Sequence, residues 1–278
     1  MKTRFSALLF CSALASSIAG CSSPRTATTM PDDDTPGAPT ESSPAVTAKP
    51  SPIPGLYHRI YLGYVLPSLK PAEFTKTMNG KFLPLFPKAN PVGLAAYRPA
   101  LPKSSKTCPL PSEVALLSFT SEKDYGKYRE TKIGKKIREA HTPVFRADSK
   151  SVVPEALTDT IHFGHAYSLS PGNHDYRGSF STLVIHCDPV LSGEDLRVAL
   201  VKPYALGTEA TDVLFAVTPT FVAEYVFFPK AGDLEARIAE RNERFKGIFR
   251  AATVVRLPKR QIGKKKVSVG EGIDAQWR

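Results

Sequence analysis

The chain has 278 residues, of which 42% are hydrophobic, and it contains 15 Phe and 10 Tyr. These values are typical of a globular protein with a sizeable core and exclude a chain that is disordered throughout. The formal net charge of +11 favours anionic partners such as lipid head groups or acidic cell-wall polymers, with solubility alone as the alternative.

Residues 1–20 predict an export signal, because two basic residues precede an apolar run at Phe5–Ala19. Ile18–Gly20 leads directly into Cys21. This arrangement resembles the lipobox of bacterial lipoproteins, an aliphatic residue and two small residues before a cysteine. The resemblance implies that Cys21 carries palmitate-type acyl chains and anchors the protein in the cell envelope, at the outer membrane if the cell is Gram-negative. A cleaved secretory peptide and an uncleaved anchor are the alternatives, although the run is short for a span of about 20 residues.

Residues 21–55 predict a disordered tether. Pro, Ser and Thr dominate this stretch, and it has almost no large apolar side chains. It therefore cannot bury enough surface to offset the entropy of ordering. A flexible linker of this length spans about 30 Å on average, so the folded body should stand off the membrane.

The region after the tether predicts two units with one order of elements: strand, helix, strand, strand, helix, strand. In the first unit, 56–158, the expected elements are 57–66, 71–85, 93–100, 113–120, 121–140 and 143–153. A His/Gly-rich connector, 159–178, leads to the second unit, 179–257. There the expected elements are 180–187, 192–206, 213–218, 221–228, 233–249 and 251–257. Similar segments in the two units, PVFRADSKSVV and GIFRAATVVRL, favour a duplication.

Two βαββαβ units in tandem resemble ferredoxin-like folds, and a fused pair is similar to the dimeric α/β-barrel superfamily. The resemblance implies an α+β fold in which two sheets pack face to face with helices outside. The superfamily includes cofactor-free monooxygenases, haem-degrading enzymes and chlorite-dismutase-like haem proteins, and fold alone does not choose among them. The haem-degrading members use a tryptophan, whereas the single tryptophan here, Trp277, lies in the polar tail.

Four cysteines are present, of which Cys11 lies in the signal and Cys21 in the lipobox. Cys108 and Cys187 remain, and outside the cytoplasm such a pair can oxidise to a disulfide. Spacing does not establish that they meet. The alternative is two separate thiols, with Cys187 packed as a small core residue.

The candidate metal ligands are histidines. His162, His165 and His174 fall within 13 residues of the connector, and imidazoles ligate transition metals or haem iron. The alternative is a solvent-exposed connector whose histidines make ordinary hydrogen bonds. His186 is placed in a strand, where it is either a haem ligand facing the barrel interior or a structural histidine.

Polar side chains within strands supply the catalytic candidates. Such residues could line a polar pocket between the two sheets, with Glu224 as general base, or they could lie on sheet edges or face solvent. His186 is the other catalytic candidate. The polar strand residues are Arg59, Tyr61, Tyr97, Arg98 and Glu224. The sequence has no nucleophile elbow, phosphate loop or dinucleotide fingerprint.

The last stretch, 258–278, is a basic tail whose cluster could contact anionic lipid or polymer, with a solvated tail as the alternative. The cluster comprises Lys259, Arg260, Lys264, Lys265 and Lys266. No nucleic-acid-binding module is recognisable, so nucleic acid is not an expected partner, and no protein partner is indicated. The expected function is an envelope lipoprotein with a non-catalytic binding module and no cofactor. The alternatives are an oxygenase or haem-dependent enzyme of the barrel superfamily and a metal-binding lipoprotein.

Overall fold

The computed structural model describes residues 56–169, 175–176, 179–205, 212–228 and 230–257. The predictions for Cys21, the tether, His174 and the basic tail lie outside the described residues. Across the described ranges, no helix combines the length and the apolar character that crossing a bilayer requires.

The first sheet has four antiparallel strands in the order β2-β3-β1-β4. These strands are β1 (Tyr57–Gly63), β2 (Leu94–Ala100), β3 (Glu113–Phe119) and β4 (Lys150–Val152). Its helices are α1 (Pro71–Thr77), α2 (Glu122–Glu130) and α3 (Lys132–His141). In chain order the unit is therefore βαββαβ, with the second helical stretch divided in two.

The second sheet has six strands in the order β10-β7-β9-β8-β6-β5. These strands are β5 (Pro154–Ala156), β6 (Ala166–Ser168), β7 (Phe180–Pro189), β8 (Asp212–Val217), β9 (Phe221–Phe228) and β10 (Phe249–Leu257). Its helices are α4 (Gly193–Ala205) and α5 (Leu234–Arg244), with a 3₁₀ turn at Ala231–Asp233. The order β10-β7-β9-β8 repeats the order β4-β1-β3-β2, so the predicted fold of two tandem ferredoxin-like units is confirmed.

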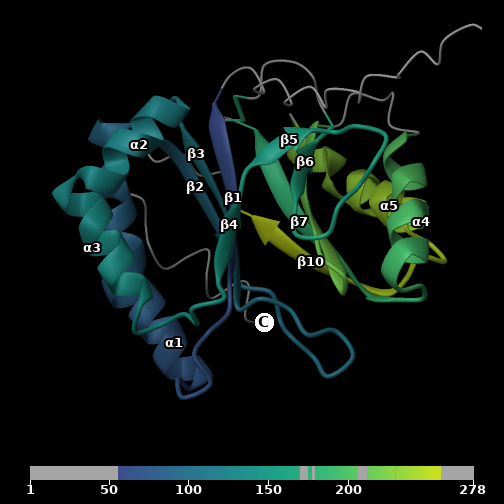
Figure 1. Ribbon diagram of the computed structural model, residues 1–278, viewed down its shortest axis with the longest axis horizontal. Helices are drawn as coiled ribbons and strands as arrows, with labels where there is room; N and C mark the ends of the chain where they lie inside the picture. Colours follow the sequence, from purple (N-terminus) through teal and green to yellow (C-terminus); the bar gives the residue numbers. More distant parts are fainter. Residues whose placement is uncertain (1–55, 170–174, 177–178, 206–211, 229, 258–278) are drawn as a thin grey trace, which may run out of the picture. The chain divides into compact units, whose positions relative to one another are not determined.

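Three buried apolar clusters define the layers. One cluster joins Ile60 and Leu116 of the first sheet to Leu183 and Ile185 of the second, so the two sheets pack face to face. A second cluster lies between the first sheet and its helices, and a third lies between the second sheet and α4 and α5. Figure 1 shows the helices of each unit on the outer side of their own sheet. Because strand side chains alternate between faces, each sheet presents one apolar set to the other sheet and another to its helices.

The predicted first helix, 71–85, is only partly α-helical. After α1 the chain continues as a π-helical turn, Met78–Phe82, and a 3₁₀ helix, Leu83–Val92. Pro84, Pro87 and Pro91 fall in this segment and have no backbone N–H to donate, which disfavours a continuous α-helix.

The predicted helix 121–140 is two helices that meet at Thr131. Thr131 has an extended backbone, with φ −68° and ψ 156°, which ends α2. Its Oγ1 accepts a hydrogen bond from the Gly134 N–H at 3.1 Å and so caps α3. The turn requires glycine at position 134, because a Cβ there would lie 2.1 Å from the Tyr128 carbonyl oxygen.

Two further boundaries differ from the prediction. The strand expected at 143–153 is reduced to β4, because the chain turns where the Ser149 N–H donates to the Arg146 carbonyl at 3.1 Å. The expected connector, 159–178, contributes β6, which pairs with β8 and extends the second sheet. Its short Ala166–Ser168 run, flanked by His and Gly, has too little periodicity to predict a strand.

Cys108 and Cys187 form a disulfide, with their Cα atoms 5.6 Å apart. Cys187 lies in β7, and Cys108 lies in the loop between β2 and β3, so the bond joins the two units. The two cysteines are 79 positions apart in sequence. In the chain-entropy model, closing a loop of this size stabilises the fold by about 4.5 kcal/mol.

Removing this disulfide should lower the free energy of unfolding by about 2–5 kcal/mol, because the unfolded chain regains the freedom of a long loop. Guanidinium denaturation of the wild type with and without reductant measures the effect. A Cys108→Ser/Cys187→Ser variant should match the reduced wild type and should not respond to reductant. An unchanged wild-type midpoint in reductant would contradict the prediction.

Candidate active site

A cavity of about 120 Å³ lies between the outer face of the first sheet and helices α2 and α3. Strand alternation directs Arg59 and Tyr61 of β1 and Glu113 of β3 to this face. Most of the remaining wall is aromatic or apolar. It includes Phe82, Phe86, Tyr97, Ala115, Leu117, Tyr125, Tyr128, Ile137 and His141.

A buried Glu113–Tyr97 pair lies in the cavity wall. Glu113 has 0% of its surface exposed, and the Tyr97 hydroxyl donates a hydrogen bond to Glu113 Oε1. Tyr97 is itself held in place, because its ring stacks on Phe86 with the centroids 3.7 Å apart and the planes 5° apart. The other carboxyl oxygen of Glu113, Oε2, has no hydrogen-bond partner among the described residues. A buried oxygen of this kind is rare in folded proteins and marks a site that a ligand could satisfy.

Burial raises the pKa of Glu113 to about 7, although the hydrogen bond from Tyr97 acts in the opposite direction. No basic group contributes to this shift. Burial and the neighbouring Glu113 carboxyl raise the pKa of Tyr97 well above its ordinary value, so Tyr97 stays protonated as a donor. Glu113 can therefore both take and release a proton near neutral pH, as general acid–base catalysis requires.

Tyr61 and His141 add neutral polar groups to the same wall. Burial, with a smaller effect of the Glu113 charge, raises the pKa of Tyr61 well above its ordinary value. His141 Nδ1 lies 2.7 Å from the Ile137 carbonyl oxygen, so this nitrogen carries the proton and Nε2 is left as an acceptor. Burial lowers the pKa of His141. The Tyr61 hydroxyl and the His141 imidazole therefore remain uncharged at neutral pH.

The stability contribution of Glu113 should fall as the pH rises. Its pKa is about 7 in the folded state against an ordinary 4.5, so the folded state binds more protons between these values. The free energy of unfolding should therefore decrease across this window, by an amount on the order of 3 kcal/mol. Urea denaturation of the wild type and of Glu113→Gln from pH 4 to pH 8 isolates the contribution of Glu113. A difference in the free energy of unfolding between the two proteins that stays constant across that range would contradict the prediction.

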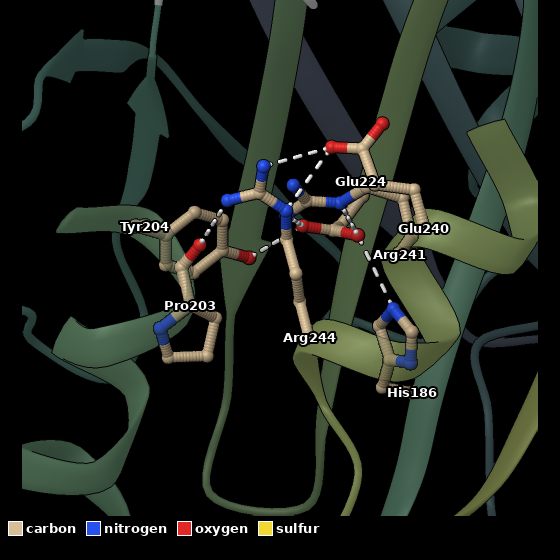
Figure 2. Close-up of polar contacts among 7 residues, drawn as sticks. All are labelled: His186, Pro203, Tyr204, Glu224, Glu240, Arg241 and Arg244. Carbon is tan, nitrogen blue, oxygen red and sulfur yellow. Dashed lines mark hydrogen bonds and ion pairs between the residues drawn. The ribbon is translucent and has the colours of Figure 1, made fainter. Parts of the chain in front are cut away.

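The predicted catalytic candidates His186 and Glu224 do meet, but in a filled site of the second unit. Figure 2 shows Glu224 surrounded by donors from three elements. Arg241 Nε donates to Glu224 Oε2 at 3.0 Å and Arg241 Nη2 donates to Oε1 at 2.5 Å. The Tyr204 hydroxyl donates to Oε1 at 2.8 Å, and His186 Nε2 lies 3.2 Å from Oε2. The carboxyl is thus a fully bonded anion.

The electrostatics of Glu224 are opposite to those of Glu113. Burial acts to raise the pKa of Glu224, but the charge of Arg241 and the hydrogen bonds from His186 and Arg241 outweigh it and lower the pKa to about 2. Glu224 and Arg241 are 0% and 1% exposed. A carboxylate held in this way stabilises the fold and is a poor base at neutral pH.

The surroundings of His186 do not fit a haem. Its Nε2, the atom an iron would take, contacts Glu224. Its ring stacks on Phe245 with the centroids 4.0 Å apart, and the Phe249 ring lies 6.1 Å away. Arg241 has its guanidinium carbon 5.6 Å from the same Phe245 ring. A planar macrocycle would have to displace these packed side chains.

The other candidate residues are placed as follows. The rings of His162 and His165 lie 5.6 Å apart, and His174 is outside the described residues. Among the residues that the structure describes, no group of three His, Cys, Asp or Glu side chains could hold a metal ion. Arg98 is not in the cavity; it is buried and donates to Ser181 Oγ of the second sheet at 2.7 Å.

Glu113 is the functional candidate that sequence reasoning missed. The strand at 113–120 is predicted, but its first residue carries no motif. The available signal is alternation, since Glu113, Ala115 and Leu117 share one face of the strand. A carboxyl on a face that is otherwise apolar is either paired or functional.

No family model and no curated protein matches the chain. Among solved structures it is similar to an anthrone oxidase-like protein, with 12% identity, coverage of 77% of this chain and 96% of that one, and a TM-score of 0.40. A monooxygenase-like protein from Fusobacterium nucleatum subsp. nucleatum has 10% identity, coverage of 75% and 93%, and a TM-score of 0.40. Chlorite dismutase from Candidatus Nitrospira defluvii has 8% identity, coverage of 71% and 87%, and a TM-score of 0.29.

These comparisons contradict the prediction of a non-catalytic binding module. The similar solved structures are described as an anthrone oxidase-like protein, a monooxygenase-like protein and a chlorite dismutase, and not as binding modules. At these identities the likeness concerns the fold, and any chemistry has to come from the residues of the cavity.

Proposed function

We propose that the chain is an enzyme whose active site is the cavity of the first unit, with Glu113 as the general base. The observation that carries this proposal is the fully buried Glu113 carboxyl. Its Oε2 has no described partner, it lines the cavity, and burial raises its pKa to about 7. Such a carboxyl is placed to take a proton from a bound molecule rather than to form an ion pair.

The cavity is close in size to one that holds a single planar ring, although slightly smaller. An apolar protein cavity of about 150 Å³ admits benzene, and this one measures about 120 Å³. The stacked Phe86 and Tyr97 rings, with Phe82 and Tyr125, form walls that favour an aromatic guest. A larger substrate would place one ring in the cavity and the rest outside.

We propose that the reaction is oxygenation of a phenolic ring or of a methylene group activated by neighbouring unsaturation. Glu113 removes a proton, which leaves an electron-rich carbanion or phenolate on the substrate. The Tyr61 hydroxyl, kept protonated by its raised pKa, can donate a hydrogen bond to the oxyanion. Dioxygen is the oxidant. For a methylene substrate the balance is R₂CH₂ + O₂ → R₂C=O + H₂O, and for a phenol it is C₆H₅OH + O₂ → C₆H₄O₂ + H₂O, in which the product is a quinone. In both cases the substrate supplies all the electrons, so no external reductant is needed.

Oxygen uptake with a panel of single-ring phenols and activated methylene compounds tests this proposal. We expect substrate-dependent uptake with ¹⁸O₂ in which one labelled atom enters the product and the other enters water. A Glu113→Gln variant should lower the rate of uptake by at least about 100-fold, whereas the control Glu155→Gln, which changes a carboxyl in β5 away from the cavity, should behave as wild type. Uptake at a near-wild-type rate in Glu113→Gln, or product oxygen that comes from water, would contradict the proposal.

We also propose that the enzyme acts at the cell envelope, anchored through Cys21. The support is the Ile18–Gly20 segment before Cys21, and the basic cluster at 259–266 could add contact with anionic head groups. A Cys21→Ser variant should move from the membrane fraction to the soluble fraction and lose incorporation of labelled palmitate. A variant that stays membrane-bound without a lipid would show that the anchor lies elsewhere.

A further inference from the structure

Three arginines line the cavity: Arg59 of β1, Arg129 of α2 and Arg138 of α3. Arg59 is half-buried, whereas Arg129 and Arg138 are exposed, so the positive charge lies on the solvent side of the cavity. Glu113 is the only carboxyl among the described residues of the lining, and its raised pKa leaves about half of it protonated at neutral pH. The cavity therefore has a single carboxyl on its inner wall and a cationic entrance.

The three guanidinium groups are held by other side chains and by backbone, not by anions. The guanidinium carbons of Arg59 and Arg129 lie 4.5 Å and 6.0 Å from the centroid of the Tyr125 ring. Arg59 Nε donates to Ser151 Oγ at 3.0 Å, and Arg138 Nη1 donates to the Arg129 carbonyl at 2.6 Å. Each group still has unused N–H donors.

None of these arginines forms an ion pair with any of the described residues. Other arginines of the chain do so, for example Arg146 with Asp148 and Arg244 with Glu240. Grouped cations without a counter-ion repel one another and attract an anion. The planar guanidinium binds a carboxylate with two parallel hydrogen bonds, which adds orientation to the attraction.

We propose that the substrate is an aromatic carboxylate whose ring enters the cavity and whose carboxylate binds Arg129 and Arg138, with Arg59 nearby. The inference deepens the proposed function, because it concerns the ligand of the same cavity. It orients the ligand as well: the anionic group stays at the entrance, and the opposite end of the ring points toward Glu113. A para-hydroxybenzoate is the smallest compound with both features.

Calorimetric titration with 4-hydroxybenzoate and with its neutral isostere 4-hydroxybenzamide tests the inference. We expect wild type to bind the carboxylate about 10- to 100-fold more tightly than the amide, the range typical of charge-assisted hydrogen bonds. Arg129→Gln and Arg138→Gln should each reduce this preference, and the double variant should abolish it. Lys136→Gln removes the same charge from an exposed site of α3 outside the cavity and should keep it.

The outcomes separate this inference from the proposed function. Equal affinity for the two compounds in wild type, or an equal loss of preference in Lys136→Gln, would overturn the anionic-substrate inference even if Glu113-dependent oxygen uptake is found with neutral phenols. Preferential binding of the carboxylate that depends on Arg129 and Arg138, without oxygen uptake, would support the inference and contradict the proposed reaction. The Glu113→Gln variant should retain the binding preference, because the change lies at the inner wall.

Discussion

Replacing Glu113 by Gln should lower turnover by about 10²- to 10⁴-fold, the range for losing a general acid–base group. Gln has nearly the same shape as Glu, so the cavity and its aromatic walls should be preserved. The amide cannot take a proton from the substrate, whereas the carboxyl can, because burial raises its pKa to about 7. Initial rates of the two purified proteins under saturating substrate measure the effect.

The dependence of the reaction rate on pH provides a second test of the role of Glu113. The wild-type rate should rise with pH through an apparent pKa near 7, because the carboxylate is the active form of the base. Tyr97→Phe removes the hydrogen bond to Oε1 and should shift this apparent pKa upward, since the bond stabilises the carboxylate. If Glu113 had only a structural role, the pH dependence of the rate would be the same in Tyr97→Phe as in the wild type. Near-normal turnover by Glu113→Gln would refute the assignment of Glu113 as the base.

Replacing Arg241 by Met should lower the free energy of unfolding by about 3–5 kcal/mol, the usual cost of leaving a buried charge without its partner. Glu224 is 0% exposed and loses both of its bonds to the guanidinium. Tyr204 and His186 would still donate to it, but neither replaces the fixed positive charge. Urea denaturation at pH 7 measures the loss.

A matched change in the same helix is the control for this prediction. Arg244→Met also removes an arginine from α5, but the Arg244 and Glu240 side chains are 16% and 23% exposed. Water screens this ion pair, so its loss should cost about 1 kcal/mol or less. The double variant Arg241→Met/Glu224→Gln should recover much of the stability lost in Arg241→Met, because no buried charge remains. Equal losses in the two single variants would contradict the buried-pair interpretation.

The two units thus use a buried glutamate in opposite ways. In the second unit the layer between sheet and helices is closed by Glu224, Arg241 and stacked rings, and the carboxyl is a permanent anion. In the first unit the equivalent layer contains a cavity, and Glu113 has no cationic partner among the residues that the structure describes. In a duplicated fold, one copy can therefore contribute mainly to stability while the other copy contains the candidate active site.

The sequence by itself determined the element order, because helical and strand periodicities are local properties that a window of residues contains. It therefore predicted both βαββαβ units and the fold class, and it showed that two cysteines were available to pair. It also placed Arg59, Tyr61 and Tyr97 in strands, but the pocket that they were expected to line lay between the two sheets. The cavity that they do line lies between the first sheet and its helices. The break at Thr131 and the short strand β6 were not predicted, because neither is marked by a clear change in helical or strand periodicity.

Only the tertiary structure decided which carboxyl is paired and which is not. Glu224 lies 17 positions before Arg241 and 38 after His186, and Glu113 lies 16 after Tyr97. These partners come from different strands and helices, so no local pattern records them. The pKa of a carboxyl follows from burial and from neighbouring charge. Both depend on the packing of helices onto sheets, which is why the sequence pointed to Glu224 and the folded chain points to Glu113.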